Sequence, residues 1–217
     1  MNRTNIKKQF KKAARYFRDF SIVVASIAVT LWVQSELNYR NEKKDTALYL
    51  NILKQEMEDN CIIIDNLIVT MEKTKHYIHY ISAHDEKTLH QDTIQQYWSV
   101  FHEIPYYGYM YDAFEIFKTS GNMRFISDKE LLRLIWGIYH MMKAQDEWIA
   151  LYHQKKMEEV TKENQMEAEG KPPVIPMYNF YFTFSNKGEI ESNFIQNAEG
   201  LLPLIKEALA DIEKMLK

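Results

Sequence analysis

Histidine is the residue type that most suggests chemistry in this sequence, because five of the seven histidines fall within 27 residues. They are His76, His79, His84, His90 and His102. His76 and His79 are three residues apart, so on a helix they share one face and have a spacing that suits a transition-metal ion. The metalloprotease pattern His-Glu-x-x-His and the di-iron pattern Glu-x-x-His do not occur. We therefore expect solvated histidines or histidines at the edge of a core, with no metal and no cofactor.

Tyrosine is concentrated in residues 105–111, where four tyrosines occupy six positions. Such a segment could stack against a glycan or a peptide, but aromatic residues near helix ends more often fill a core. We expect core filling here, and the alternative is a ligand pocket lined by His102, Tyr106, Tyr109 and Tyr111. No phosphate loop, dinucleotide fingerprint, nucleophile elbow or pair of catalytic carboxylates is recognisable, so we expect a protein that is not an enzyme.

Cys61 is the only cysteine, which excludes an intrachain disulfide and a cysteine-rich zinc site. It falls on an apolar stripe of a predicted helix, where an unpaired thiol usually packs as a small apolar group. We expect a packed thiol rather than a redox site.

The elements that position these residues are predicted to be long helices. The chain has 217 residues, of which 46% are hydrophobic, and none of its 6 Gly and 5 Pro lies before Pro105. Strands and tight turns need such residues, so the sequence predicts an all-α fold. We expect an N-terminal transmembrane helix that continues into an antiparallel bundle of long helices with short accessory helices.

The longest predicted helix covers residues 34–82, and apolar residues recur along it at helical spacing. This stripe consists of Leu50, Leu53, Met57, Cys61, Ile64, Ile68, Met71, Ile78 and Ile81. A short helix is predicted over residues 92–104, with Asp92 as N-cap, because Pro105 ends it. Another short helix is predicted over 110–120, and Gly121 supplies its left-handed C-terminal residue.

A second long helix is predicted to run from a capping box at Ser127–Glu130 to about Ala168. Its apolar stripe consists of Leu131, Leu134, Ile138, Met141, Trp148 and Leu151. Two long helices joined by short ones favour an antiparallel pair. The remaining predicted elements are an extended aromatic segment over 177–184, a turn over 186–188 and a final helix over 201–217 with Pro203 in its first turn.

Charge is divided between a basic head and an acidic body. Residues 1–18 contain seven Lys and Arg and no Asp or Glu, which gives the head a charge of +7. From residue 19 onward 20 Lys and Arg stand against 30 Asp and Glu, which gives the body a charge of −10. A basic head favours the phosphates of nucleic acid or of anionic lipid. The apolar segment that follows it favours a lipid bilayer, and we expect no nucleic-acid partner.

Residues 20–33 contain no charge and no strong helix breaker, and they predict a transmembrane signal anchor over residues 19–35. The residues expected to form the anchor are Phe20, Ile22, Val23, Val24, Ile27, Val29, Leu31, Trp32 and Val33. Fourteen residues are short for a span, but Tyr16, Phe17 and Trp32 extend it as interfacial aromatics. Two alternatives remain, namely a buried or interfacial helix and a secretory signal cleaved at Ser26–Ala28.

Basic residues are more numerous before the apolar segment than after it, where Arg40, Lys43 and Lys44 follow. The positive-inside rule therefore predicts that residues 1–18 form a basic cytoplasmic segment. Residues 36–217 then form an extracytoplasmic helical domain on a chain that crosses the membrane once.

Several segments resemble a bacterial domain-of-unknown-function family of single-pass membrane-anchored helical proteins. The resemblance lies in Asp19 and Ser26 of the anchor and in the segments 38–44, 49–60 and 119–130. The chain departs from the family pattern because it lacks a Gly in the anchor and a Trp-Asn-Glu triplet. The resemblance implies a single-pass helical protein, and it implies no activity or ligand. With the charge bias, we expect a protein of the bacterial inner membrane whose C-terminal domain lies in the periplasm.

The predicted function is that of a non-enzymatic interaction or scaffold module. Its expected partners are the lipid bilayer and either a protein or a second copy of the chain, bound through the long helices. The alternatives are a membrane-tethered ligand-binding or sensory module, and a soluble cytoplasmic helical protein in which residues 20–33 form an internal core helix.

Overall fold

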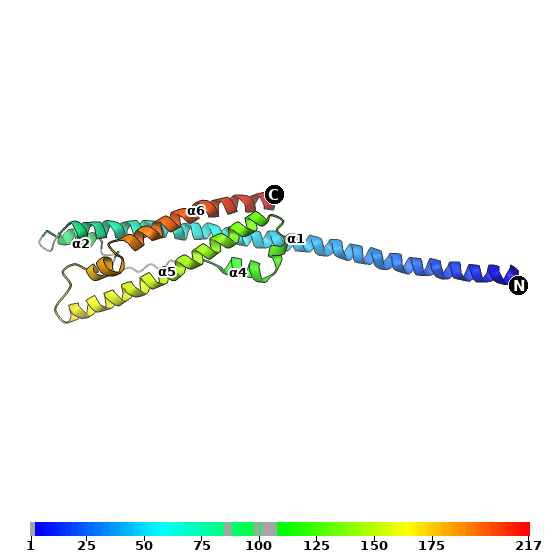
Figure 1. The fold of residues 1–217 in the computed structure, drawn as a ribbon, viewed down its shortest axis with the longest axis horizontal. Helices are drawn as coiled ribbons and strands as arrows, with labels where there is room; N and C mark the ends of the chain where they lie inside the picture. The colour runs from blue at the N-terminus through cyan, green and yellow to red at the C-terminus, as the bar shows by residue number, and fades with distance from the viewer. Residues whose placement is uncertain (1–2, 85–87, 98–99, 101–107) are drawn as a thin grey trace. The chain divides into compact units, whose positions relative to one another are not determined.

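The computed structural model describes residues 3–84, 88–97, 100 and 108–217, with side chains from residue 20 onward. Its elements are α1 (Arg3–Ala83), α2 (Gln91–Gln96), α4 (Asp112–Thr119), the 3₁₀ helix η1 (Asn122–Phe125), α5 (Lys129–Ala168), the π-helix η2 (Phe180–Phe184) and α6 (Glu189–Leu216), as drawn in Figure 1. No strand occurs within these described ranges, and the all-α fold class is confirmed. The chain divides into one unit of residues Met1–Leu48 and a second of residues Tyr49–Lys217.

Helix α1 is 81 residues long and passes without interruption from the first unit into the second. Because no Gly or Pro precedes Pro105, nothing in this part of the sequence breaks the ladder of backbone hydrogen bonds. The predicted helix over 34–82 is confirmed, and the apolar segment 20–33 belongs to the same helix.

In the second unit, α1 buries one face at alternating intervals of three and four residues. This seam consists of Leu50, Leu53, Met57, Asn60, Ile64, Leu67, Met71, Thr74, Ile78 and Ile81. It differs from the predicted stripe because the polar residues Asn60 and Thr74 complete the heptad spacing. Cys61 and Ile68, which the sequence analysis placed on the stripe, lie beside the seam and are half-buried.

Beyond Ile138 the buried face of α5 has a different register from the one predicted. Its seam consists of Leu131, Ile135, Ile138, Met142, Gln145, Ile149, Tyr152 and Lys156. Leu131 and Ile138 of the predicted stripe are buried and Leu134 is half-buried, but Met141, Trp148 and Leu151 are 41%, 62% and 37% exposed, so the predicted stripe was right as far as Ile138 and wrong beyond it. The polar seam residues Gln145 and Lys156 interrupt the apolar pattern and drew the prediction onto a neighbouring face.

The ends of α5 were largely predictable. The N-cap is Asp128 rather than Ser127, because the Asp128 carboxylate accepts hydrogen bonds from the N–H groups of Glu130 and Leu131 at 3.0 Å each. The helix ends at Ala168 as predicted, shortly before Gly170, whose φ of 76° requires the left-handed conformation that glycine adopts readily.

The contacts within the second unit fix the directions of its three long helices (Figure 1). Lys54 of α1 pairs with Glu213 of α6 at 2.7 Å, and Ile78 of α1 packs beside Gly188 at the start of α6, so α1 and α6 are antiparallel. In contrast, α1 and α5 run in the same direction, because Glu56 contacts Tyr139 whereas the end of α1 lies near the end of α5. The predicted antiparallel pair of α1 and α5 is thus corrected, since the chain returns to the level of Glu56 before α5 begins.

Helix α6 begins at Glu189, twelve residues before the predicted start, and Pro203 lies in its interior rather than in its first turn. Proline removes one N–H from the ladder and leaves the carbonyl four residues earlier, that of Glu199, without its helical donor. Both residues are exposed, so water can solvate that carbonyl and the helix continues.

The aromatic segment 177–184 is helical and not extended, which overturns the sequence prediction. Residues Phe180–Phe184 form a single π-helical turn that buries Phe180 against Tyr152 and Tyr181 against Tyr77, with ring centres 5.1 and 5.8 Å apart. The spacing of the aromatic residues could not distinguish this helical turn from an extended segment, because large side chains can pack on several sides of the backbone. The turn over 186–188 is confirmed, since all three residues have positive φ.

The short helices agree with the predictions in place but not in detail. Helix α2 begins after His90, so Asp92 lies in its first turn and is not its N-cap. The rest of the predicted helix over 92–104 falls mostly outside the described residues. Helix α4 lies within the predicted range 110–120, and Gly121 has the expected left-handed conformation with φ of 75°.

Candidate functional site

The apolar segment of α1 is the clearest candidate for a functional surface. Every predicted anchor residue from Phe20 to Val33 is exposed, by between 44% for Val33 and 69% for Trp32. Ile22, Val23, Ile27 and Leu31 would be buried if this segment were a core helix, and each is more than half exposed. Within the described part of the chain, α1 is long and apolar enough to cross a membrane.

The polar side chains inside this segment are satisfied by the helix itself. The Ser26 hydroxyl donates a hydrogen bond to the carbonyl of Ile22 at 2.8 Å, and the Thr30 hydroxyl donates to the carbonyl of Ser26 at 2.8 Å. A polar group without a partner is costly in hydrocarbon, so this internal bonding suits a lipid environment. The first charged pair after the segment joins Arg40 to Glu36 at 2.9 Å.

A buried carboxylate of α1 binds the first turn of α4. Glu56 is 6% exposed, and its carboxylate accepts hydrogen bonds from the N–H groups of Ala113 at 2.6 Å and Phe114 at 3.1 Å, and from the Tyr139 hydroxyl at 2.6 Å. Tyr111, the residue at the N-cap of α4, provides no side-chain cap. Glu56 therefore caps α4 from another helix and places its negative charge at the positive end of the helix dipole.

Asn60 lies one turn after Glu56 and binds the backbone of Met110, just before α4. Its side-chain amide donates to the carbonyl of Met110 at 2.9 Å, and its amide oxygen accepts from the N–H of Met110 at 2.8 Å. Both polar side chains were missed by sequence reasoning. The signal that was available is their spacing of four residues, which puts two polar residues at the edge of a predicted buried face.

The two described tyrosines of segment 105–111, Tyr109 and Tyr111, pack within the bundle, Tyr109 buried and Tyr111 half-buried. Tyr109 is 6% exposed and donates to the Gln145 side chain at 2.8 Å, while Tyr111 donates to the Asp146 carboxylate at 2.6 Å. Burial raises the pKa of the Tyr109 hydroxyl, which keeps it protonated. Core filling is confirmed for Tyr109, and the proposed pocket residues His102 and Tyr106 lie outside the described residues.

A second buried polar cluster joins α5, η2 and α6. Glu191 is fully buried and accepts hydrogen bonds from the Tyr152 hydroxyl at 2.7 Å and from the Ser185 hydroxyl. The Ser185 hydroxyl in turn accepts from the N–H of Gly188 at 3.1 Å. Burial raises the pKa of Glu191, and the nearby Lys156 acts in the opposite direction. The cluster is well satisfied and is arranged for packing rather than for catalysis.

The histidines do not form a shared site among the described residues. His76, His79 and His90 are exposed, Nδ1 of His84 lies 2.8 Å from the carbonyl of Tyr80, and His102 falls outside the described ranges. Within the described side chains, no group of three His, Cys, Asp or Glu is arranged for a metal ion. The half-buried thiol of Cys61 has a raised pKa because of burial, so it is protonated at neutral pH.

His153 is a half-buried histidine that sequence reasoning did not single out. Both of its ring nitrogens are buried without a hydrogen-bond partner in the described part of the chain. Burial lowers the pKa of the imidazole, and the charge of Lys156 adds to this effect. The ring is therefore neutral at physiological pH and packs beside Tyr152, with ring centres 6.2 Å apart.

Comparisons with protein-family models, with curated proteins and with solved structures found no match to this chain. The resemblance to a family of membrane-anchored helical proteins therefore stays a prediction. Function must be argued from the residues and their geometry.

Proposed function

We propose that this chain is a single-pass membrane protein of the bacterial inner membrane whose helical body acts as a non-enzymatic interaction module. The observation that carries the proposal is the uncharged apolar segment 20–33, exposed along its whole length within one uninterrupted helix. Exposed apolar surface on a soluble monomer is normally scattered, whereas here it covers every side of a helix over several turns.

The length of the apolar segment supports a span with aromatic ends. Fourteen helical residues rise about 21 Å, and the 17 residues from Tyr16 to Trp32 rise about 25 Å, against a hydrocarbon core of about 30 Å. Trp32 is the most exposed of the large apolar residues in the segment, as an interfacial aromatic would be. Local thinning of the bilayer accommodates the remaining difference.

The proposed orientation follows from charge. The seven basic residues of 1–18 remain in the cytoplasm, where anionic lipid head groups attract them, and residues 36–217 lie on the opposite side of the membrane. Residues 19–35 act as an uncleaved signal anchor.

Exposed aromatic residues of α5 support an interaction role for the body. Met141 and Trp148, seven residues apart on one side of α5, are 41% and 62% exposed, whereas Trp136, 44% exposed, lies on another side. Large aromatic residues and methionine are enriched at protein interfaces, so the side with Met141 and Trp148 suits a protein partner or a second copy of the chain.

Fractionation of cells that produce the full chain tests the anchor. We expect the protein to sediment with membranes, to resist extraction by salt and to be released by detergent. The double substitution Val24→Arg with Ile27→Arg should abolish membrane recovery, because each central arginine costs about 3 kcal/mol. The matched control is Val69→Arg, which changes an exposed valine of the same helix in the second unit. Recovery of the wild-type chain in the soluble fraction without detergent would refute the proposal.

A further inference from the structure

A hollow of about 520 Å³ lies where the ends of α1 and α5 meet the chain that leads into η2. Its lining comes from three parts of the chain. These are Ile81 at the end of α1 with His84 just after it, Glu159 and Glu163 of α5, and Tyr178 and Phe182 of the segment around η2. All of these residues belong to the second unit, so the hollow is independent of the membrane segment.

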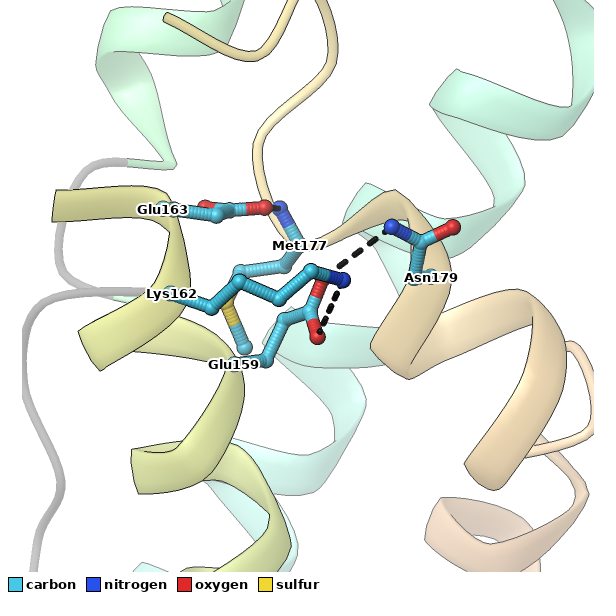
Figure 2. Close-up of polar contacts among 5 residues, drawn as sticks. All are labelled: Glu159, Lys162, Glu163, Met177 and Asn179. Carbon is cyan, nitrogen blue, oxygen red and sulfur yellow. Dashed lines mark hydrogen bonds and ion pairs between the residues drawn. The ribbon is translucent and has the colours of Figure 1, made fainter. Parts of the chain in front are cut away.

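Glu163 supplies a carboxylate without a cationic partner. Its side chain is half-buried and accepts one hydrogen bond, from the N–H of Met177 at 2.6 Å (Figure 2). In the described part of the chain no lysine, arginine or histidine lies within ion-pair distance of it. Two carboxylate oxygens accept about four hydrogen bonds, so most of this capacity is unused.

Glu159, one turn earlier, is already neutralised. Its carboxylate lies 3.4 Å from the Lys162 ammonium and accepts a hydrogen bond from the Asn179 side chain at 3.2 Å, as Figure 2 shows. The charge of Lys162 is thereby used on Glu159. Glu163 is in no ion pair among the described side chains, so when it is ionised, above its raised pKa, the hollow carries one further negative charge, which Lys162 offsets only through space.

Another part of the lining is aromatic and apolar. The rings of Tyr178 and Phe182 stack with their centres 4.3 Å apart and their planes 14° apart. The ammonium of Lys187 lies 5.9 Å from the centre of the Phe182 ring, so this ring already attracts one cation. Ile81 and Val174 add aliphatic surface to the same hollow.

His84 adds a hydrogen-bond acceptor to the hollow. Its Nδ1 lies 2.8 Å from the carbonyl oxygen of Tyr80, and because a carbonyl accepts, Nδ1 must be the donor. In the neutral imidazole Nε2 is then an acceptor. Glu163 and His84 thus both favour a ligand that donates hydrogen bonds.

We propose that this hollow binds a small organic cation, namely a protonated amine that carries an aromatic or branched apolar group. The ammonium pairs with Glu163 and donates to Nε2 of His84, and the apolar part lies against Tyr178 and Phe182. A single positive charge matches the single carboxylate of the hollow that is in no ion pair among the described side chains. This binding site goes beyond the proposed membrane attachment and does not depend on it.

Calorimetry with benzylamine on the full chain in lipid nanodiscs tests the proposal at about pH 8, where amine and carboxylate are both charged. We expect saturable binding with a Kd on the order of 1 mM. Benzyl alcohol, which has nearly the same shape and no charge, should not bind measurably. Glu163→Gln keeps an acceptor for the N–H of Met177 and should weaken binding at least about tenfold. The control Glu158→Gln changes an exposed glutamate of α5 that does not line the hollow, and it should leave binding unchanged.

A second variant separates loss of the site from misfolding. Val174 is 58% exposed on the rim of the hollow, so Val174→Lys should leave the fold intact and place an ammonium near Glu163. We expect this variant to keep the wild-type circular dichroism and to lose benzylamine binding. No saturable heat with the wild-type chain, or benzylamine binding by both Glu163→Gln and Val174→Lys that is as strong as that of the wild type, would overturn the proposal. Either result would leave the membrane anchor unaffected.

Discussion

The carboxylate of Glu56 caps a helix to which it does not belong, because it accepts the N–H of Ala113 in the first turn of α4 at 2.6 Å. The two residues are 57 positions apart in the sequence. The same carboxylate accepts the Tyr139 hydroxyl, so α1, α4 and α5 meet at one buried charge. Three hydrogen bonds from donors on two elements compensate for the loss of water around it.

Removing this carboxylate should destabilise the bundle strongly. In Glu56→Ala the first N–H groups of α4 and the buried Tyr139 hydroxyl lose their acceptor, which we expect to cost about 3 kcal/mol of unfolding free energy. Urea unfolding followed by circular dichroism measures this. The control Glu58→Ala removes an exposed glutamate two residues away and should cost less than about 0.5 kcal/mol. Equal effects of the two substitutions would contradict the cap.

The register of α5 can be tested with two adjacent residues. Ile149 is 2% exposed on the seam, and Trp148 is 62% exposed beside it. We expect Ile149→Ala to lower the unfolding free energy by about 3 kcal/mol, because it opens a cavity in the core. Trp148→Ala removes a larger side chain but should change it by less than about 0.5 kcal/mol. A larger loss from the tryptophan would show that the predicted stripe, and not the observed seam, faces the core.

Stability should depend on pH through Glu163. Burial raises the pKa of Glu163 to about 7 from 4.5, against the hydrogen bond from Met177, which lowers it. Between these values the folded chain holds a proton that the unfolded chain releases, so the stabilisation is complete below about pH 4.5 and is lost as pH rises through about 7. Because the group is half-exposed and water screens it, we expect a loss of about 1 kcal/mol.

Urea titrations of the wild type and of Glu163→Gln across this range isolate the contribution of Glu163. His153 has the opposite effect, because its lowered pKa makes its contribution to the unfolding free energy decrease as pH falls. His153 is present in both proteins, so this contribution cancels in their difference. A difference between the two proteins that does not change with pH would refute the assignment.

Cys61 should be a slow nucleophile in the folded chain. Burial raises the pKa of its thiol, so little thiolate exists at neutral pH. We expect alkylation by iodoacetamide to be slower in the folded chain than in the chain unfolded in urea, with mass spectrometry counting the single added group. Alkylation that is equally fast in both states would show that the thiol is freely accessible.

A C-terminal alkaline phosphatase fusion reports the orientation of the anchor. The positive-inside rule predicts activity, since this enzyme requires the oxidising periplasm. Changing the four lysines at positions 7, 8, 11 and 12 to glutamine should lower the activity by weakening the charge bias. An inactive phosphatase fusion, together with activity of a cytoplasmic reporter fused to the same C-terminus, would reverse the proposed topology.

The sequence was sufficient for those features that depend on local rules. The continuity of α1 follows from the lack of Gly and Pro before residue 105, and the end of α5 at Ala168 follows from Gly170. The left-handed residues Gly121 and Gly188 were likewise recognisable as punctuation.

Other features depend on contacts that are distant in the sequence. Gln145 looks like a surface residue until the Tyr109 hydroxyl, 36 positions away, is found to donate to it. Pro203 was predicted to lie in the first turn of its helix, as proline usually does. The tertiary contacts that extend α6 back to Glu189 cannot be read from the local sequence. The hollow beside Glu163 combines three segments, and no single segment has a motif that announces it.

Two buried polar residues of α1, Asn60 on its seam and Glu56 beside it, also restrict how the helices can slide past one another. A purely apolar heptad seam packs almost equally well after one helix shifts by seven residues, because each apolar side chain then meets another apolar side chain at the equivalent position. Here such a shift would carry Asn60 about 10 Å away from the backbone of Met110 and would strand Glu56 without the amino end of α4. The desolvated amide and carboxylate therefore exclude neighbouring alignments, and the bundle has one register.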